Sequence, residues 1–426
     1  MTIRCFCSCA LYELQSLTTH ICAIRPYIPQ ISKLEHNKLI FSKVPTLRFP
    51  NYSGEWQVSS MGKVCTFRKG YGISKENLSS DGTPCILYGE LYTTYKTAIA
   101  KRIKSKTSLD PTTLFHSKKN DVIIPCSGET AEDIATSVCI PYDDILLGGD
   151  LTVIRSDLDG AFLSNQINSV RKYDIARIAQ GKSIVHLQAD ELKKIFIAYP
   201  TIEEQQKISG FIDKIDERIE VQNKIISDLN VLKKELCNKV FSKGFAVRLG
   251  DFIEEVTTRN KSNSCENVLS VSNKMGFIKQ SEQFEDRTVA SEDKRNYKVV
   301  TEGCFAYNPA RINVGSIALL STQKIGIISP MYVCFKTKNT LNSEYLNFYY
   351  QSGFFYKEMQ KKLEGSVRQC LTYENMSDIL IPYVDIEKQK AIAATLNKFA
   401  TLIANEEKYL KSLQKQKSYF LNAMFI

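Results

Sequence analysis

The stretch Ile195-Phe196-Ile197-Ala198-Tyr199-Pro200-Thr201-Ile202-Glu203-Glu204-Gln205 recurs in altered form later in this 426-residue sequence. The second copy, 184 residues downstream, is Ile379-Leu380-Ile381-Pro382-Tyr383-Val384-Asp385-Ile386-Glu387-Lys388-Gln389. Upstream, Gly181 and Leu187 match Gly365 and Leu371 at the same offset. Self-similarity at a fixed offset indicates a repeated structural plan. The chain is therefore predicted to be a tandem duplication.

Apolar residues recur every seven positions after each block, in two interleaved series. Eight of ten series positions are apolar in each copy, and the polar exceptions Gln222 and Lys233 match Glu406 and Lys417. An apolar stripe of this length needs a partner helix, and the chain supplies two such helices. We predict that the two helices pair, although separate packing of each on a globular domain is a second interpretation. The apolar positions are Ile208, Ile212, Ile215, Ile219, Ile226, Leu229, Leu236 and Val240 in the first helix and Ile392, Leu396, Phe399, Ile403, Leu410, Leu413, Phe420 and Met424 in the second.

The segments before the helices contain short apolar and β-branched runs broken by turn-forming residues, which predicts an α/β (α+β) fold. Strands are expected at 121–124, 151–154, 316–319 and 332–335, and a helix with an aromatic face at 345–363. The predicted order is head 1 (44–200), a helix (201–243), head 2 (244–384) and a second helix (385–426). Residues 1–43, with Cys5, Cys7 and Cys9, are expected to form a poorly ordered extension, with a metal-binding thiol cluster as the alternative.

The two heads begin alike, at Ser60-Met61-Gly62 and Arg248-Leu249-Gly250, but their interiors differ in sequence, as expected of binding heads for different targets. Both carry basic and amide side chains. Arg and Lys can neutralise phosphates or pair with guanine, and Asn can read adenine. Each cluster alone is weak evidence, because a charge run is usually a solvated face. The predicted DNA-binding residues are Arg68, Lys69, Tyr71, Lys75, Tyr92, Tyr95, Lys101, Arg102 and Lys104 in head 1 and Ser272, Asn273, Lys274, Asn308, Arg311 and Asn313 in head 2.

Composition and motifs argue against an enzyme. The 13 cysteines are scattered without a CxxC pair, and the four histidines pair with no cysteine at zinc-ligand spacing, so a reducing cytoplasm and no metal are expected. The formal net charge of +10 fits a nucleic-acid partner without requiring one. No phosphate loop or dinucleotide fingerprint occurs, so no cofactor is predicted. No apolar run reaches the roughly 20 residues of a membrane span.

Asn308-Pro309-Ala310-Arg311 lacks the second proline and the aromatic residue of an amino-methyltransferase loop, so that interpretation is rejected.

The order of these features resembles the specificity (S) subunits of Type I restriction–modification systems over nearly everything after residue 43. Pro45-Thr46-Leu47-Arg48-Phe49-Pro50, followed by Gly54-Glu55-Trp56, resembles the usual opening of that family. The blocks Tyr199–Gln205 and Pro382–Gln389 resemble the beginning of its two conserved helices. The chain departs from the pattern in residues 1–43, which precede the usual start, and at Val384, which replaces the proline found at Pro200.

The resemblance implies a non-catalytic subunit. Each head would be a target-recognition domain for one half of a bipartite site in double-stranded DNA. The helices would pair as an antiparallel coiled coil, and a length of about 50 Å from Ile208 to Val240 exceeds one DNA turn of about 34–36 Å. Two modification (methyltransferase) subunits would dock on this frame, and restriction (translocase–nuclease) subunits would join them. The alternative is a non-enzymatic coiled-coil scaffold with two protein-binding heads.

Overall fold

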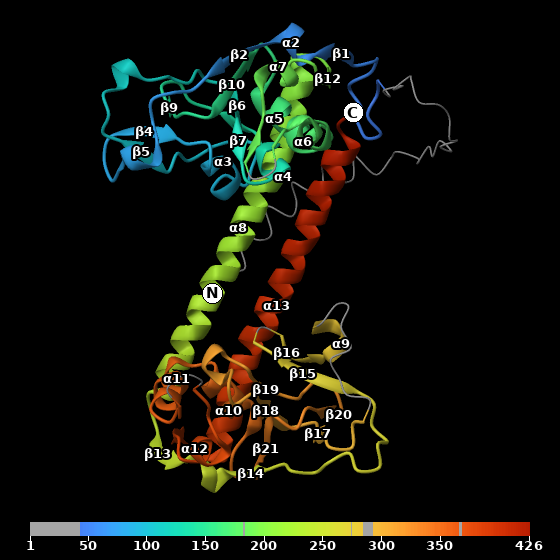
Figure 1. Ribbon diagram of the computed structural model, residues 1–426. Helices are drawn as coiled ribbons and strands as arrows, with labels where there is room; N and C mark the ends of the chain where they lie inside the picture. Colours follow the sequence, from blue (N-terminus) through green and yellow to red (C-terminus); the bar gives the residue numbers. More distant parts are fainter. Residues whose placement is uncertain (1–42, 182–183, 274, 284–292, 366–368) are drawn as a thin grey trace. The chain divides into compact units, whose positions relative to one another are not determined.

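The computed structural model describes residues 43–181, 184–273, 275–283, 293–365 and 369–426 (Figure 1). They form two compact units. Unit 1 holds the chain up to Val221 together with Lys411–Ile426, and unit 2 holds Gln222–Leu410. Each unit contains one head, part of helix α8 (Ile202–Phe241) and part of helix α13 (Ile386–Ala423). Both predicted long helices are therefore present, and the predicted N-terminal extension lies almost entirely outside the described residues.

Head 1 is built on two four-stranded sheets. One has the antiparallel order β2-β10-β6-β8, and the other has the order β3-β5-β4-β9, in which β4 and β9 run parallel. A two-stranded sheet of β1 (Gln57–Ser60) and β12 (Phe196–Tyr199) lies just before α8. The other strands are β2 (Cys65–Lys69), β3 (Leu78–Ser79), β4 (Thr83–Ile86), β5 (Ser105–Thr107), β6 (Asp121–Pro125), β7 (Ser127–Gly128), β8 (Val138–Ile140), β9 (Leu146–Leu147), β10 (Leu151–Ser156) and β11 (Val185–His186).

Head 2 repeats this frame although its interior sequence differs. The antiparallel sheet has the order β14-β21-β18-β19, and the mixed sheet has the order β16-β15-β20-β17, in which β15 and β20 run parallel. The strand pair before α13 is β13 (Phe245–Arg248) with β22 (Leu380–Tyr383). The other strands are β14 (Ile253–Glu255), β15 (Val268–Ser272), β16 (Gly276–Lys279), β17 (Lys298–Thr301), β18 (Cys304–Tyr307), β19 (Ile317–Leu319), β20 (Ile325–Ile328) and β21 (Val333–Thr337). The antiparallel sheet therefore has the same strand order in both heads. The mixed sheets share a three-stranded part, β5-β4-β9 and β16-β15-β20, but the fourth strand lies beside β5 in head 1 and beside β20 in head 2.

Short helices complete each head. In head 1 they are α2 (Met61–Val64), α3 (Glu90–Thr93), α4 (Ala131–Ile134), α5 (Gly160–Asn168), α6 (Lys172–Ile178) and α7 (Ala189–Leu192), with 3-10 turns η1 (Lys75–Asn77) and η2 (Pro111–Thr113). In head 2 they are α9 (Gln280–Gln283), α10 (Ser343–Tyr350), α11 (Gly353–Gln360) and α12 (Tyr373–Ser377), with η3 (Leu249–Phe252) and η4 (Ile312–Val314).

The single helix predicted at 345–363 is wrong, because α10 ends at Tyr350 and α11 begins at Gly353. The Ser352 side chain accepts a hydrogen bond from the backbone N–H of Phe355 and so caps the second helix.

A buried glutamine joins each repeated block to its head in the same way. Gln205 Oε1 accepts a hydrogen bond from the backbone N–H of Asp159, the N-cap of α5, at 2.9 Å. Gln389 Oε1 accepts from the backbone N–H of Asn342, the N-cap of α10, at 2.8 Å. Each glutamine Nε2 also donates to a carbonyl just before its own helix, that of Pro200 or Val384. The repeated Gln therefore fixes a head helix on a long helix.

The last turn of each long helix packs on the head that precedes the other long helix. In unit 1, the ring of Phe425, just beyond α13, lies 5.0 Å from that of Phe162 on α5. In unit 2, the ring of Phe241 on α8 lies 5.2 Å from that of Tyr345 on α10. Burial of these aromatic side chains is a large part of the apolar contact between helix and head. Each head is therefore held by the beginning of one long helix and the end of the other.

The two long helices run antiparallel within each unit, as predicted. In unit 1, Phe211 on α8 packs edge-on against Phe420 on α13, with ring centroids 4.9 Å apart. In unit 2, Gln222 Nε2 donates to the carboxylate of Glu406 at 2.6 Å. Farther along α8, Phe241 shares a core with Leu396 of α13. All the apolar seam positions named from the sequence are buried or partly buried.

The polar exceptions in the seam are satisfied, but not symmetrically. Gln222 and Glu406, which match in the repeat, bond to each other. Lys417 forms an ion pair of 2.6 Å with Asp216, whose side chain is 8% exposed. The matching Lys233 instead donates to Gln351 at 3.3 Å. A buried polar pair in a coiled coil specifies register, because any slip leaves the polar groups without partners.

Candidate nucleic-acid interface

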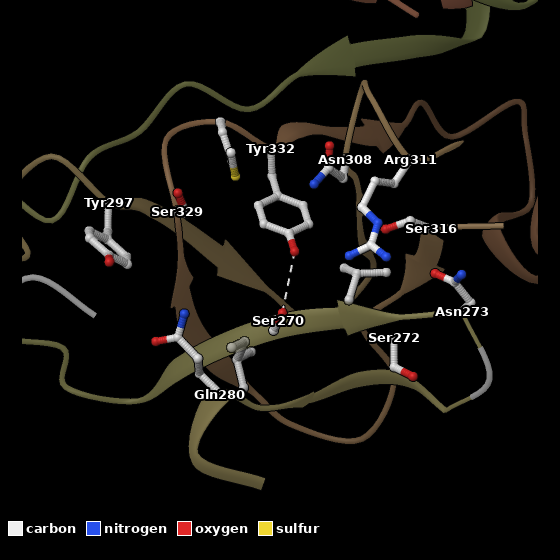
Figure 2. A pocket seen from close by; sticks show the side chains of 13 residues that line it. Ser270, Ser272, Asn273, Gln280, Tyr297, Asn308, Arg311, Ser316, Ser329 and Tyr332 are labelled. Atoms are coloured by element: carbon white, nitrogen blue, oxygen red, sulfur yellow. Dashed lines mark hydrogen bonds between the residues drawn. The ribbon is translucent and has the colours of Figure 1, made fainter. Parts of the chain in front are cut away.

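A pocket of about 460 Å³ opens in head 2 (Figure 2). Most of its lining comes from strand β15 with the residue that follows it, the loop between β18 and β19, and the loop between β20 and β21; Gln280 of α9 and Tyr297, just before β17, also line it. Several of the residues predicted from the sequence to bind DNA meet here, although they are far apart in the chain. They are Ser272, Asn273, Asn308 and Arg311.

Arg311 extends from the β18–β19 loop toward the strand that carries Ser270 (Figure 2). It immediately precedes η4, and Gly315, which follows η4 as its C-cap, has a φ of +90°. An L side chain is strained at such a φ, so glycine is suited to the turn that shapes this loop. Among the described residues, the guanidinium of Arg311 has no hydrogen bond or ion pair within the protein.

The other arginines of head 2 that the structure describes have partners within the protein. Arg248 pairs with Asp378 at 2.5 Å, and Arg295 pairs with Asp293 at 2.9 Å. Arg259 donates to Asn296, with a longer separation of 3.4 Å. Arg311 therefore differs from these three in having its donors available to a ligand, in a pocket lined by further polar groups.

The amides in the pocket have different roles. The side-chain oxygen Oδ1 of Asn308 accepts a hydrogen bond from the backbone N–H of Ala310 at 3.1 Å, which holds this side chain in the loop. Asn273 is exposed and, in the described part of the chain, its amide has no partner within the protein. The Tyr332 hydroxyl lies 3.3 Å from Ser270 Oγ, so this pair closes one wall. Arg311 and Asn273 thus present free hydrogen-bonding groups from two separate loops.

Exposed apolar side chains adjoin the same loops. Met331, which lines the pocket, is 62% exposed. Met275 follows Asn273 by two positions and is 75% exposed, and Val314 follows Arg311 by three and is 56% exposed. Exposed apolar residues beside unpaired polar donors indicate a binding surface rather than a solvated face.

The head 1 candidates form no comparable pocket with one another in the described residues. Arg68 and Lys69 end β2, and Lys75 begins η1; all three are exposed. Tyr71 is 53% exposed, and its ring packs edge-on against Phe115 at 6.1 Å. Arg102 and Lys104 are exposed in the segment before β5. These side chains remain available to DNA, so their assignment stays a prediction.

Two head 1 candidates have structural roles instead. Tyr95 is 8% exposed and belongs to an apolar core, because its ring is needed to fill the space beside α3. The ammonium group of Lys101 lies 2.7 Å from carboxylates of both Asp213 and Glu217 on α8. Burial would lower the pKa of Lys101, but hydrogen bonds to these carboxylates raise it, so the charge holds head 1 to α8. Both residues are removed from the proposed DNA surface.

Three other residues that were predicted to bind DNA do not line the head 2 pocket among the described residues. Tyr92 is partly buried and lines a second pocket, of about 360 Å³, with residues of α5, α6 and α13 in unit 1. Asn313 is partly buried within η4 and does not line the head 2 pocket. Lys274 lies outside the described residues.

Sequence reasoning missed several residues that line the head 2 pocket. Ser270, Ser316 and Tyr332 occupy strands or strand edges, where nothing in the local sequence sets them apart from core residues. The pairing of β15 with β20 brings Ser270 and Tyr332 together, and Ser316 comes from the segment just before β19, in the other sheet. Exposed Met331 carried a faint signal, since a large apolar residue after Pro330 fits neither a core strand nor a polar turn.

No group of three or more His, Cys, Asp or Glu side chains that could hold a metal occurs in the described ranges. Nor do those ranges contain a helix with the length and apolar character needed to cross a membrane. The described cysteines are unpaired thiols. The described residues form similar frames in the two heads, and Asn308 and Arg311 of head 2 lie on a loop between strands.

A family model described as the type I restriction modification DNA specificity domain matches residues 53–231 and, again, residues 246–415. The chain belongs to this family. It is a specificity subunit, and such subunits are non-catalytic, so the family accounts for the absence of an active-site motif. The two matches also coincide with the duplicated frame, each covering a head and most of the long helix that follows it.

Relatives and solved structures agree with this placement. The type I restriction enzyme MjaVIII specificity subunit of Methanocaldococcus jannaschii is 23% identical, over 90% of this chain and 94% of that protein. A type I restriction–modification S subunit from M. genitalium shares the fold, with a TM-score of 0.59 at 15% identity, over 90% of this chain and 99% of that one. A chain from work on complex assembly and conformational transition of the type I R-M system has a TM-score of 0.51 at 16% identity, over 86% and 96% of the two chains.

Proposed function

We propose that each head reads one half of an asymmetric bipartite site in double-stranded DNA, while the paired long helices set the length of the unread spacer. The observation that carries this proposal is the contrast between frame and loops. Both heads repeat the same antiparallel sheet, a three-stranded part of the mixed sheet and the same Gln-to-N-cap contact, yet the loops on them differ. Because the reading loops differ, the two half-sites are expected to differ in sequence.

The helices offer a surface for two modification (methyltransferase) subunits. In unit 2, Ile225 and Leu232 of α8 are 39% and 51% exposed, and Leu402 of α13 is 43% exposed. They lie outside the seam positions, and exposed apolar residues on a paired helix mark a contact with a further protein. Restriction (translocase–nuclease) subunits would join the resulting complex. The non-DNA scaffold interpretation is not favoured by membership of a DNA specificity family.

The site of action that follows from this proposal is the cytoplasm, where cellular DNA and the partner subunits meet. Unpaired thiols such as Cys85, Cys139 and Cys334 are compatible with a reducing compartment.

Methylome sequencing tests the proposal directly. The modification subunits are expressed in a host without background methylation, with and without this chain. A bipartite methylated motif that depends on the chain is expected, and its absence would refute the proposed role. Docking is tested separately by Ile225→Asp and Leu402→Asp, which are expected to abolish co-purification with the modification subunit. Ser227→Asp, on an exposed position of the same helix, is the matched control and should leave binding unchanged.

A further inference from the structure

We propose that the head 2 pocket reads a guanine through Arg311, with Asn273 contacting a neighbouring base pair of the same half-site. This inference rests on the proposed function, and it adds the specificity-determining residues and the base that one of them selects. The pocket gathers these groups from the β18–β19 loop and from the turn after β15 (Figure 2). Arg311 and Asn273 are far apart in the sequence.

The chemistry of Arg311 selects guanine over other bases. A guanidinium has five N–H donors and no acceptor, and its planar fork matches the O6 and N7 acceptors of guanine in the major groove. Adenine offers N7 beside an amino donor, which would face another donor. A protein carboxylate would compete for the guanidinium, but none contacts Arg311 in the described residues. The side chain therefore has both the geometry and the freedom to make a two-bond contact.

Its surroundings favour base reading over a contact with phosphate alone. Asn273 supplies both a donor and an acceptor, which is the combination that pairs with an adenine edge. Met331 and Val314 supply exposed apolar groups, which suit the methyl group of thymine. A phosphate site would instead be expected to gather several cations, whereas Arg311 is the one cationic side chain among the described residues that line the pocket.

The corresponding loop of head 1 has the opposite charge. Sheet order places the β6–β8 segment of head 1 where head 2 has its β18–β19 loop. That segment, Cys126–Ser137, contains Glu129, Glu132 and Asp133 and no arginine. Carboxylates accept hydrogen bonds and cannot donate to guanine O6 and N7. Guanine selection by this loop is therefore confined to head 2, and only one half-site depends on it.

The test is methylome sequencing of the complete methyltransferase complex carrying Arg311→Ala or Arg311→Lys. Both variants are expected to lose about 10- to 100-fold of the discrimination at one G·C position, since lysine cannot reproduce the two-bond fork. The other half-site and the spacer are expected to remain as in the wild type. Arg248→Ala is the matched control, because Arg248 is an exposed arginine of the same head that lies on β13 and pairs with Asp378.

Each outcome decides between the two proposals. A wild-type motif that Arg311→Ala leaves unchanged overturns the inference and leaves the proposed function standing. A change in the other half-site, or at an A·T position, also overturns it. If no motif depends on the chain at all, both proposals fail. If Arg311→Ala does not assemble with the modification subunits, Asn273→Ala decides, because it must relax a position in one half-site only and leave the spacer unchanged.

Discussion

Replacing Gln389 by leucine removes the contact that fixes head 2 on α13. The side chain is fully buried, accepts from the backbone N–H of Asn342 at 2.8 Å, and donates to the carbonyl oxygens of Val384 at 2.8 Å and Thr340 at 3.3 Å. Leucine fills a similar space but bonds to none of them. The N-cap of α10 and the turn that leads into α13 would both lose a partner.

The expected loss of stability follows from these bonds. Each buried backbone group left without a partner costs about 1–3 kcal/mol, and the added apolar burial of leucine offsets part of this cost. The Asn342 N–H and the carbonyl of Val384 are the two groups most affected. A net loss of about 2–3 kcal/mol is expected, which lowers the melting temperature by roughly 4–12 °C for a unit of this size.

The same substitution can be made at the matching glutamine of head 1, and at an exposed glutamine as a control. Gln205→Leu breaks the equivalent bonds to Asp159 and Pro200 in head 1, and a loss of similar size is expected. Gln206→Leu makes the same substitution at the next, exposed residue of α8. Thermal unfolding followed by circular dichroism measures all three variants. If Gln389→Leu melted no lower than Gln206→Leu, the coupling of head to helix would not depend on this residue.

Three further predictions follow from the seam and the core. Inserting seven residues in both helices, beside Gln222 and beside Glu406, adds roughly 10 Å to each helix. Because DNA rises about 3.4 Å per base pair, the spacer is expected to lengthen by about 3 base pairs. A methylated motif with an unchanged spacer would refute the proposal that the helices set the spacer length. Asp216→Ala is expected to reduce the free energy of unfolding by about 2 kcal/mol in chemical denaturation, because Lys417, 19% exposed, loses a buried partner, whereas Asp216→Leu with Lys417→Met should be near neutral. Burial raises the pKa of the Cys85 thiol to about 11 and the pKa values of the Cys139 and Cys334 thiols to about 12. Alkylation at pH 8 should therefore reach these three thiols only after unfolding. Peptide mapping that found any of them modified before unfolding would contradict this prediction.

The long helices could be predicted because their signal is local and periodic. Residues such as Ile208 and Ile212 repeat at a fixed interval, and the need to bury the resulting stripe implies a partner. The shared frame of the heads could not be predicted in this way. The parallel pairing of β4 with β9, and of β15 with β20, joins segments about 60 residues apart, and no local pattern specifies such a pairing.

The candidate site could likewise be predicted only in part from the sequence. Arg311 and Asn273 could be proposed from sequence because they lie in stretches with basic and amide side chains, which can contact phosphates and base edges. Lys101 gave the same signal, yet its ammonium group is neutralised by Asp213 and Glu217. Local sequence shows that a side chain is charged but not which distant carboxylate will meet it. That Arg311 has no side-chain partner among the described residues, on which its proposed role depends, could only come from the three-dimensional structure.

The duplicated contacts also explain how one frame can carry two different readers. The Gln-to-N-cap bonds, the aromatic contacts of Phe241 and Phe425 and the two-sheet core all lie at the head–helix junction or inside the head. Arg311 and Asn273 are exposed, and their side chains make none of these contacts, although Ile312 of the Arg311 loop belongs to the core. Under the proposed function, a substitution at these two exposed positions changes the groups offered to DNA without leaving a buried junction group unpaired, so its cost in stability is small. Under the proposed function, sequence specificity can therefore change in one half-site while the other half-site and the spacer stay fixed. The Arg311 variants test the change in specificity, and the Gln389 variant tests the stability of the junction that stays fixed.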